Sequence, residues 1–267
     1  MMRWIALTLL FLPVHAATSL DNGYREMYNM DFAAAHRTFA EYQRQNPDDP
    51  MGPVSDAAAY LFHEFERLHI LQSEFFVHDK HFATDHKLTP DPEIKRRFDE
   101  ALETAGRLAA LQPDTENSMF AEVLRSGLKS DYMALIEKRY VPSLREMKSG
   151  RKLAEKLLAR NPDHADAWLA VGIENYLLSI KPAPLRLVLR LTGAKTDGEA
   201  GLAKLRITAA KGRFLAPFAR MMLAVAALRE GKRDEAATLL RGLTKDYPRN
   251  PLYAQELARL DNGKARP

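Results

Sequence analysis

The chain of 267 residues contains no cysteine. This absence excludes disulfide bonds, thiolate metal sites, a cysteine nucleophile and the acylated cysteine of a bacterial lipoprotein. The sequence also lacks the Gly-x-Ser-x-Gly elbow of hydrolases, the Walker-type phosphate loop and the Gly-x-Gly-x-x-Gly dinucleotide fingerprint. We therefore expect a protein that is not an enzyme, with no catalytic residues and no cofactor.

Long hydrophobic runs are scarce as well. The longest, Trp4 to Val14, follows Arg3 and is shorter than the ~20 residues that a membrane-spanning helix needs. Val14-His15-Ala16 supplies small residues where a signal peptidase cleaves. The pattern predicts a signal peptide over residues 1–16 and export of residues 17–267 to the periplasm or the medium, with an uncleaved anchor as the alternative.

Strand patterns are nearly absent, whereas helix-forming patterns extend along the chain. No stretch sustains an alternation of apolar and polar residues. Apolar residues instead recur at intervals of three and four, in segments that end at Asn-Pro, Gln-Pro or Tyr-Pro. Because proline donates no amide hydrogen and biases the preceding residue away from helical angles, these dipeptides end helices. The sequence thus predicts an all-α fold.

The four proline stops resemble one another. Twelve residues before each proline the side chain is small, and five residues before it the side chain is large. The prolines are Pro47, Pro113, Pro162 and Pro248, the small residues are Ala35, Ala101, Gly150 and Ala236, and the large ones are Tyr42, Leu108, Leu157 and Leu243. A small side chain lets a second helix approach closely, which is typical of stacked helix pairs.

This pattern resembles the tetratricopeptide repeat (TPR), a helix pair of ~34 residues. Trp168, Val171 and Gly172 fall on the Trp, Leu and Gly positions of the repeat's first helix. The resemblance implies a TPR-like α-solenoid of antiparallel helix pairs over residues 17–267, forming one domain, in which Trp168 is a packing residue. Unequal proline spacings predict irregular joints near residues 126–141 and 181–201.

The last hundred residues also resemble tetratricopeptide repeat family 39, described as mitochondrial outer-membrane or inclusion-associated proteins, and its exported bacterial relatives. Leu178-Ser179, Pro182, Pro184, Gly193 and Asp197 carry this resemblance. That family is a group of scaffolds or adaptors without an established catalytic motif. The resemblance therefore implies a scaffold or adaptor of the bacterial cell envelope.

The resemblance to the repeat also implies which residues face a partner. The inner surface of one repeat would be mostly apolar, which suits an extended or helical segment of a peptide or protein. To these residues we add two arginines on one side of the short helix expected over residues 184–191. The predicted partner-binding residues are Asp166, Leu169, Ile173, Tyr176, Leu177, Arg186 and Arg190.

The sequence is compatible with two other functions. The segment from Lys181 to Arg220 has nine basic and two acidic residues, a balance that would also suit peripheral attachment to an anionic membrane surface. It lacks interleaved aromatic residues, so we expect no nucleic-acid partner.

The second alternative is a metal site in the histidine-rich stretch of residues 63–86. Its possible ligands are His63, Glu64, Glu66, His69, His78, Asp79, His81, Asp85 and His86. His63-Glu64 is not followed by a histidine at the spacing of zinc hydrolases, because His69 comes two positions too late. We therefore expect scattered surface histidines and no bound metal.

Overall fold

The computed structural model describes residues 19–72, 88–180 and 196–264, and in these ranges all regular structure is helical. The α-helices are α1 (Leu20–Tyr28), α2 (Phe32–Gln45), α3 (Met51–Arg67), α6 (Pro92–Leu111), α7 (Glu116–Asp131), α8 (Tyr140–Arg160), α9 (Trp168–Ser179), α11 (Gly198–Lys211), α12 (Ala216–Arg229), α13 (Arg233–Asp246) and α14 (Pro251–Lys264). A π-helical turn, η1 (Tyr132–Ile136), and a 3₁₀ turn, η2 (Ala165–Ala167), join them. The all-α prediction is confirmed.

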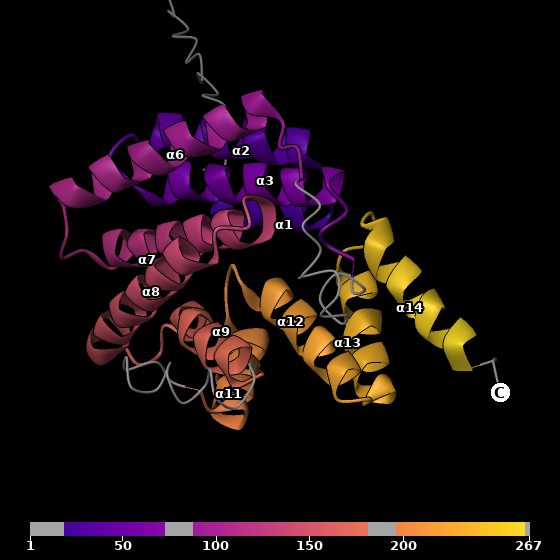
Figure 1. Ribbon diagram of the computed structural model, residues 1–267. Coiled ribbons are helices and arrows are strands. Elements are labelled where there is room, and N and C mark those ends of the chain that lie inside the picture. Colours follow the sequence, from indigo (N-terminus) through magenta and orange to yellow (C-terminus); the bar gives the residue numbers. More distant parts are fainter. Residues whose placement is uncertain (1–18, 73–87, 181–195, 265–267) are drawn as a thin grey trace, which may run out of the picture.

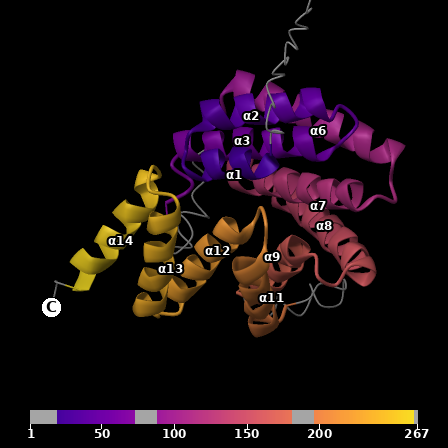
Figure 2. The same cartoon turned by 180° about the vertical axis from the view of Figure 1, so that it is seen from behind.

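Helices that follow one another in the chain pack against one another, from α1 on α2 to α13 on α14. They are arranged as an arc (Figure 1), in which α1, α2, α3 and α6 form one end and α7 and α8 continue it. The pair α9 and α11 follows, and α12, α13 and α14 turn back toward α1, as the reverse view shows (Figure 2). None of the described helices is long and apolar enough to cross a lipid bilayer.

The proline stops end four helices where the sequence predicts. In α2, α6, α8 and α13 the last helical residue lies two positions before the proline. The intervening residue is Asn46, Gln112, Asn161 or Tyr247, with φ between −128° and −137°. These extended angles are those that a following proline imposes on its neighbour.

Small residues bring the paired helices together. A Cβ atom on Gly23 of α1 would lie 2.3 Å from the ring of Phe39 in α2, so only glycine fits there. Gly172 of α9 lies against Gly201 of α11, and a Cβ on Gly201 would lie 2.7 Å from the backbone nitrogen of Tyr176. The close approach expected of these pairs is therefore a direct backbone contact in α9 and α11.

The two irregular joints differ in what the structure describes. Around the first, α7 continues to Asp131 and the irregularity is the π-helical turn and residues 137–139, so it begins later than the sequence predicts. The second falls largely on residues 181–195, which lie outside the described residues, and regular structure resumes with α11 at Gly198.

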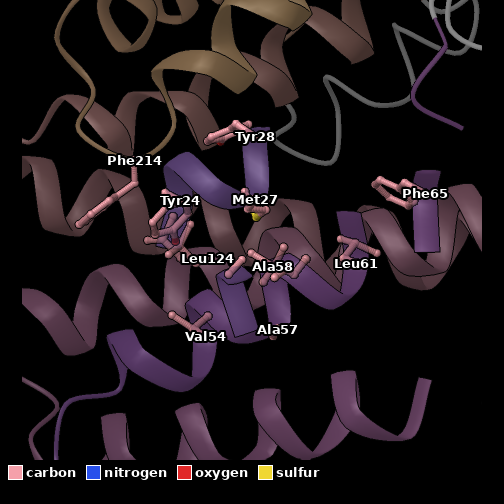
Figure 3. Close-up of a cluster of buried hydrophobic side chains, with 14 of the residues drawn as sticks. Tyr24, Met27, Tyr28, Val54, Ala57, Ala58, Leu61, Phe65, Leu124 and Phe214 are labelled. Atoms are coloured by element: carbon pink, nitrogen blue, oxygen red, sulfur yellow. The ribbon is translucent and has the colours of Figure 1, made fainter. Parts of the chain in front are cut away.

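The first helix also contacts segments almost the whole chain away. The Arg213 guanidinium pairs with Asp21 at 2.7 Å, and the Asn250 side chain donates a hydrogen bond to the Tyr28 carbonyl at 2.9 Å. The Phe214 ring stacks on Tyr24 with centroids 4.7 Å apart. Phe214, Tyr24 and Leu124 of α7 lie together in Figure 3. The link between α11 and α12 and the link between α13 and α14 therefore close the arc over α1.

A pair of glycine substitutions tests the close helix contact. We expect Gly201→Ala to lower the free energy of unfolding by about 1–3 kcal/mol, because the new methyl group meets backbone atoms of α9. Gly127→Ala in α7 is the matched control, because a Cβ there meets no described atom within 4 Å. Alanine at that position should stabilise by about 0.5–1 kcal/mol. Urea denaturation measures the free energy of unfolding of both variants. Equal changes in the two variants would contradict the close backbone contact between α9 and α11.

Candidate binding pocket at the centre of the arc

A hollow of about 90 Å³ lies where α1, α3, α7, α8, α9 and α12 meet, and it is partly open to solvent. We call it the central pocket. Its walls are mostly apolar. The lining residues are Tyr24, Met27, Tyr28, Ala58, Phe62, Val123, Leu124, Gly127, Leu128, Ser130, Asp131, Met147, Gly150, Asp166, Leu169, Ala170, Ile173, Leu215 and Phe218.

The closure of the arc forms one wall of this pocket. Leu215 and Phe218 belong to the start of α12, and Phe218 packs edge-on against Phe62 of α3 at 5.8 Å between centroids. Without the return of α12 toward α1, the pocket would be open on this side. The pocket therefore depends on contacts between the two ends of the chain.

Two carboxylates line the central pocket, and their surroundings are opposite. Asp166 is buried and accepts hydrogen bonds from the backbone amides of Arg213, Phe214 and Leu215, at 2.9–3.3 Å. Its charge is thus already used to hold the start of α12. Asp131 receives no hydrogen bond and forms no ion pair within the described parts of the chain, and its half-buried carboxyl lies among apolar groups.

The environment of Asp131 changes its acidity. Loss of water around the carboxyl raises its pKa from 3.8 to about 7. A carboxyl with a strongly raised pKa in a pocket is a candidate functional group, because the same burial that destabilises the free charge rewards a ligand that neutralises it. Asp131 is therefore the candidate functional group of the central pocket.

A tyrosine hydroxyl adds a second unused polar atom. The Oη atom of Tyr28 is buried and has no hydrogen-bond partner among the described residues. In contrast, the Oη atom of Tyr24 accepts a hydrogen bond from Ser55 at 3.1 Å. Burial raises the pKa of Tyr28 well above its usual value, so the phenol stays neutral. Tyr28 thus contributes to the wall of the pocket, and the carboxylate of Asp131 is the polar group without a partner that the pocket offers to a ligand.

A glycine keeps the central pocket empty on the α7 side. Gly127 lies in the interior of α7, where glycine costs about 1 kcal/mol relative to alanine. No described atom lies within 4 Å of a Cβ placed there, so helix packing does not require a glycine. At Gly150 of α8, a Cβ would lie 3.2 Å from Ser126. Gly127 therefore provides space in the pocket without serving a helix contact.

A larger hollow of about 440 Å³ lies at the outer edge, between the α2–α3 link and the α6–α7 link. It is shallow, and its polar groups bind one another. Asp49 accepts hydrogen bonds from the Tyr42 hydroxyl at 2.7 Å, the Asn117 amide at 3.0 Å and the Met51 backbone amide at 3.0 Å. These contacts join the turns of adjacent helix pairs, which is a structural role.

The structure divides the predicted partner-binding residues into three sets. Asp166, Leu169 and Ile173 line the central pocket. Tyr176 and Leu177 do not line the pocket and pack, together with Leu169 and Ile173, into a second hydrophobic cluster with residues of α11 and α12, where Tyr176 is only 3% exposed. The third set, Arg186 and Arg190, lies outside the described residues.

The predicted basic segment is partly engaged within the fold. Arg213 forms the ion pair with Asp21, and Arg220 pairs with Asp246 at 2.6 Å. The positive residues between 181 and 195 lie outside the described residues. The described part of the segment therefore uses two of its arginines to bind neighbouring helices.

The described histidine-rich residues are dispersed. His63 stacks on Phe32 at 4.9 Å, and burial lowers its pKa. Glu64 is buried, pairs with Arg67 at 2.8 Å and accepts a hydrogen bond from the Asp91 amide at 2.8 Å. His69 and Glu66 are exposed, whereas residues 78–86 lie outside the described residues. Where the chain is described, no three potential ligands are grouped for a metal ion.

Sequence reasoning missed Asp131, Tyr28 and Gly127, although one of them left a signal. Leu124, Leu128 and Asp131 follow one another at intervals of four and three along α7, which is the spacing of a buried helix face. A carboxylate on such a face is a sign of function. The spacing does not show which distant helices meet it.

Comparison of the chain with protein-family models, with curated proteins and with solved structures gives no match. Function is therefore inferred from the residues of the central pocket.

The raised pKa of Asp131 predicts how stability depends on pH. Between about pH 4 and pH 7 the folded chain holds this proton more tightly than the unfolded chain, so the contribution of Asp131 to stability falls as pH rises. Asp131→Asn removes that loss. Relative to the natural chain, the variant should gain on the order of 2–4 kcal/mol at pH 8 and little at pH 4, since each pKa unit corresponds to ~1.4 kcal/mol. Urea denaturation at both pH values measures this, and a gain independent of pH would contradict it.

Asp166 should matter for stability. Asp166→Ala leaves three backbone amides without their acceptor, so we expect a loss of about 3 kcal/mol in the free energy of unfolding. Asp166→Asn keeps one acceptor oxygen and should lose less. Thermal unfolding followed by circular dichroism distinguishes them, and an unchanged midpoint for Asp166→Ala would show that the amides find another partner.

Proposed function

We propose that this chain is a non-enzymatic scaffold or adaptor that binds a peptide or protein partner at the centre of a TPR-like α-solenoid. The observation that carries the proposal is the central pocket, an apolar hollow of about 90 Å³ with one unpaired carboxylate. Its location between several helix pairs is where repeat proteins of this kind bind their partners. Asp166, Leu169 and Ile173 are the pocket residues that the resemblance to the repeat also predicts.

The size of the pocket favours a side chain of a larger partner over a whole metabolite. Pockets for small molecules usually have volumes of about 300–1,000 Å³. The central pocket, at about 90 Å³, lies well below this range. One side chain fills such a space, while the rest of a peptide lies outside it.

The polar groups of the pocket also favour binding over catalysis. General acid–base catalysis needs a substrate whose reacting proton comes within hydrogen-bond reach of the catalytic group, and a hollow of about 90 Å³ is small for a whole substrate. Of the two pocket carboxylates, Asp166 is already engaged with three backbone amides, which leaves Asp131 alone. A single buried carboxylate suits recognition of a positive charge.

The repeat architecture is supported by several local features of the chain. Four helices end two residues before a proline. Ala35, Ala154 and Ala236, on the inner sides of their helices, are fully buried, and Gly172 and Gly201 meet between α9 and α11. Location in the bacterial cell envelope rests on the leader expected over residues 1–16.

Photocrosslinking from the pocket tests this function. We would place a benzoylphenylalanine at position 173, which lines the pocket, and at position 111 as the control, where Leu111 is 69% exposed and distant from the pocket. Crosslinking in the native envelope should give one dominant protein adduct from position 173 and none from position 111.

Filling the pocket supplies the matched control. Gly127→Leu should remove the adduct at position 173, whereas Gly127→Ala should keep it, because the smaller side chain leaves most of the space free. An adduct that survives Gly127→Leu would place the partner elsewhere. Adducts with lipid alone would favour attachment to the membrane instead.

A further inference from the structure

The central pocket carries charge of only one sign. Its titratable lining residues are Asp131, Asp166, Tyr24 and Tyr28, and no lysine, arginine or histidine lines it. The pocket therefore complements a positive group and opposes a negative one. An acidic peptide or a phosphate would bring a second negative charge to an unpaired carboxylate.

The apolar walls set a second requirement. The residues that line the pocket together with Asp131 include Leu124 and Leu128 on its own helix and Met147 on α8. A ligand that reaches Asp131 must therefore cover an apolar surface with an aliphatic chain. The lysine side chain combines a stem of four methylene groups with a compact charged head.

The backbone next to Asp131 departs from the ordinary α-helix. The carboxylate stands on the last residue of α7, and the π-helical turn begins at Tyr132. Turns of this type are frequent at functional sites, because they re-aim the side chains around them. The break in the helix thus coincides with the one unpaired charge of the pocket.

We infer that the central pocket binds a lysine side chain of the partner peptide, with the Asp131 carboxylate as the counter-ion of its ammonium group. The apolar lining residues would cover the methylene groups of the same side chain. This inference rests on the proposed function and names the chemistry of its ligand.

Lysine fits better than arginine for two reasons. A guanidinium presents five donors in one plane and is best satisfied by bidentate partners, whereas an ammonium has three donors. The pocket supplies a single unpaired carboxylate. Its volume of about 90 Å³ also favours the more compact head group.

Binding of this kind depends on pH because the carboxyl must be ionised. With a pKa of about 7, Asp131 is mostly charged at pH 8 and mostly neutral at pH 6. The two tyrosines of the lining do not interfere, because burial raises the pKa of Tyr24 and Tyr28 above the usual value of 10.0. The fourth titratable lining residue, Asp166, accepts hydrogen bonds from backbone amides. Affinity for lysine should therefore fall about tenfold from pH 8 to pH 6.

A positional-scanning library of decapeptides tests the inference on the purified chain. Each pool fixes one position as lysine, arginine, norleucine or glutamate, and fluorescence polarisation measures binding. At one position, lysine should bind at least tenfold more tightly than norleucine, which keeps the aliphatic stem and lacks the charge. Asp131→Asn should remove this difference, so that the lysine and norleucine pools bind this variant equally.

The outcomes separate this inference from the proposed function. Peptide binding without a preference for lysine, or a preference that persists in Asp131→Asn, would overturn the inference and leave the binding function intact. A preference for arginine would overturn the choice of lysine. If no pool binds to the natural chain, the binding function fails too. Cadaverine that binds as tightly as the best peptide would show a small amine as the ligand.

Discussion

The buried carboxylate of Asp166 organises the meeting of the two ends of the chain. It accepts hydrogen bonds from three successive amides, which fixes the link between α11 and α12. That link presents Phe214 to Tyr24 and Arg213 to Asp21, so α1 is held by a segment 192 residues away. The same link sets where α12 begins, and α12 completes the wall of the central pocket. The closure of the arc and the wall of the central pocket therefore both depend on the hydrogen bonds of Asp166.

Local sequence signals predict the helices well, because their causes are local. The residue before each proline is forced out of helical angles, and this ends α2, α6, α8 and α13 where expected. The sequence predicts the lining of the candidate pocket only in part. Asp166, Leu169 and Ile173 of the predicted residues line it, whereas Tyr176 is buried in the second hydrophobic cluster and does not. Which helices face one another across the arc depends on contacts between distant residues, and a repeat pattern carries no information on these.

Asp131 is unlike the most deeply buried charges of the fold. Arg151 of α8 is buried and pairs with Glu174 of α9 at 2.8 Å, and Glu64 pairs with Arg67. Burying a charge is costly unless a partner compensates it, and these pairs follow that rule. Asp131 departs from it where Gly127 also leaves space that helix packing does not need. The unpaired carboxyl of Asp131 and the glycine inside α7 both lower the stability of the fold, and two such costs at one location are typical of a binding site.

The closed arc has a consequence for how the chain folds. In an open repeat array each unit contacts only its neighbours, so folding can begin anywhere and spread. Here Asn250 holds the end of α1 through the Tyr28 carbonyl, and the two residues are 222 positions apart. The contacts of α1 with Phe214 and Asn250 form only after those residues have been synthesised. Until then, the rings of Tyr24 and Tyr28 lack the cover that these later segments provide.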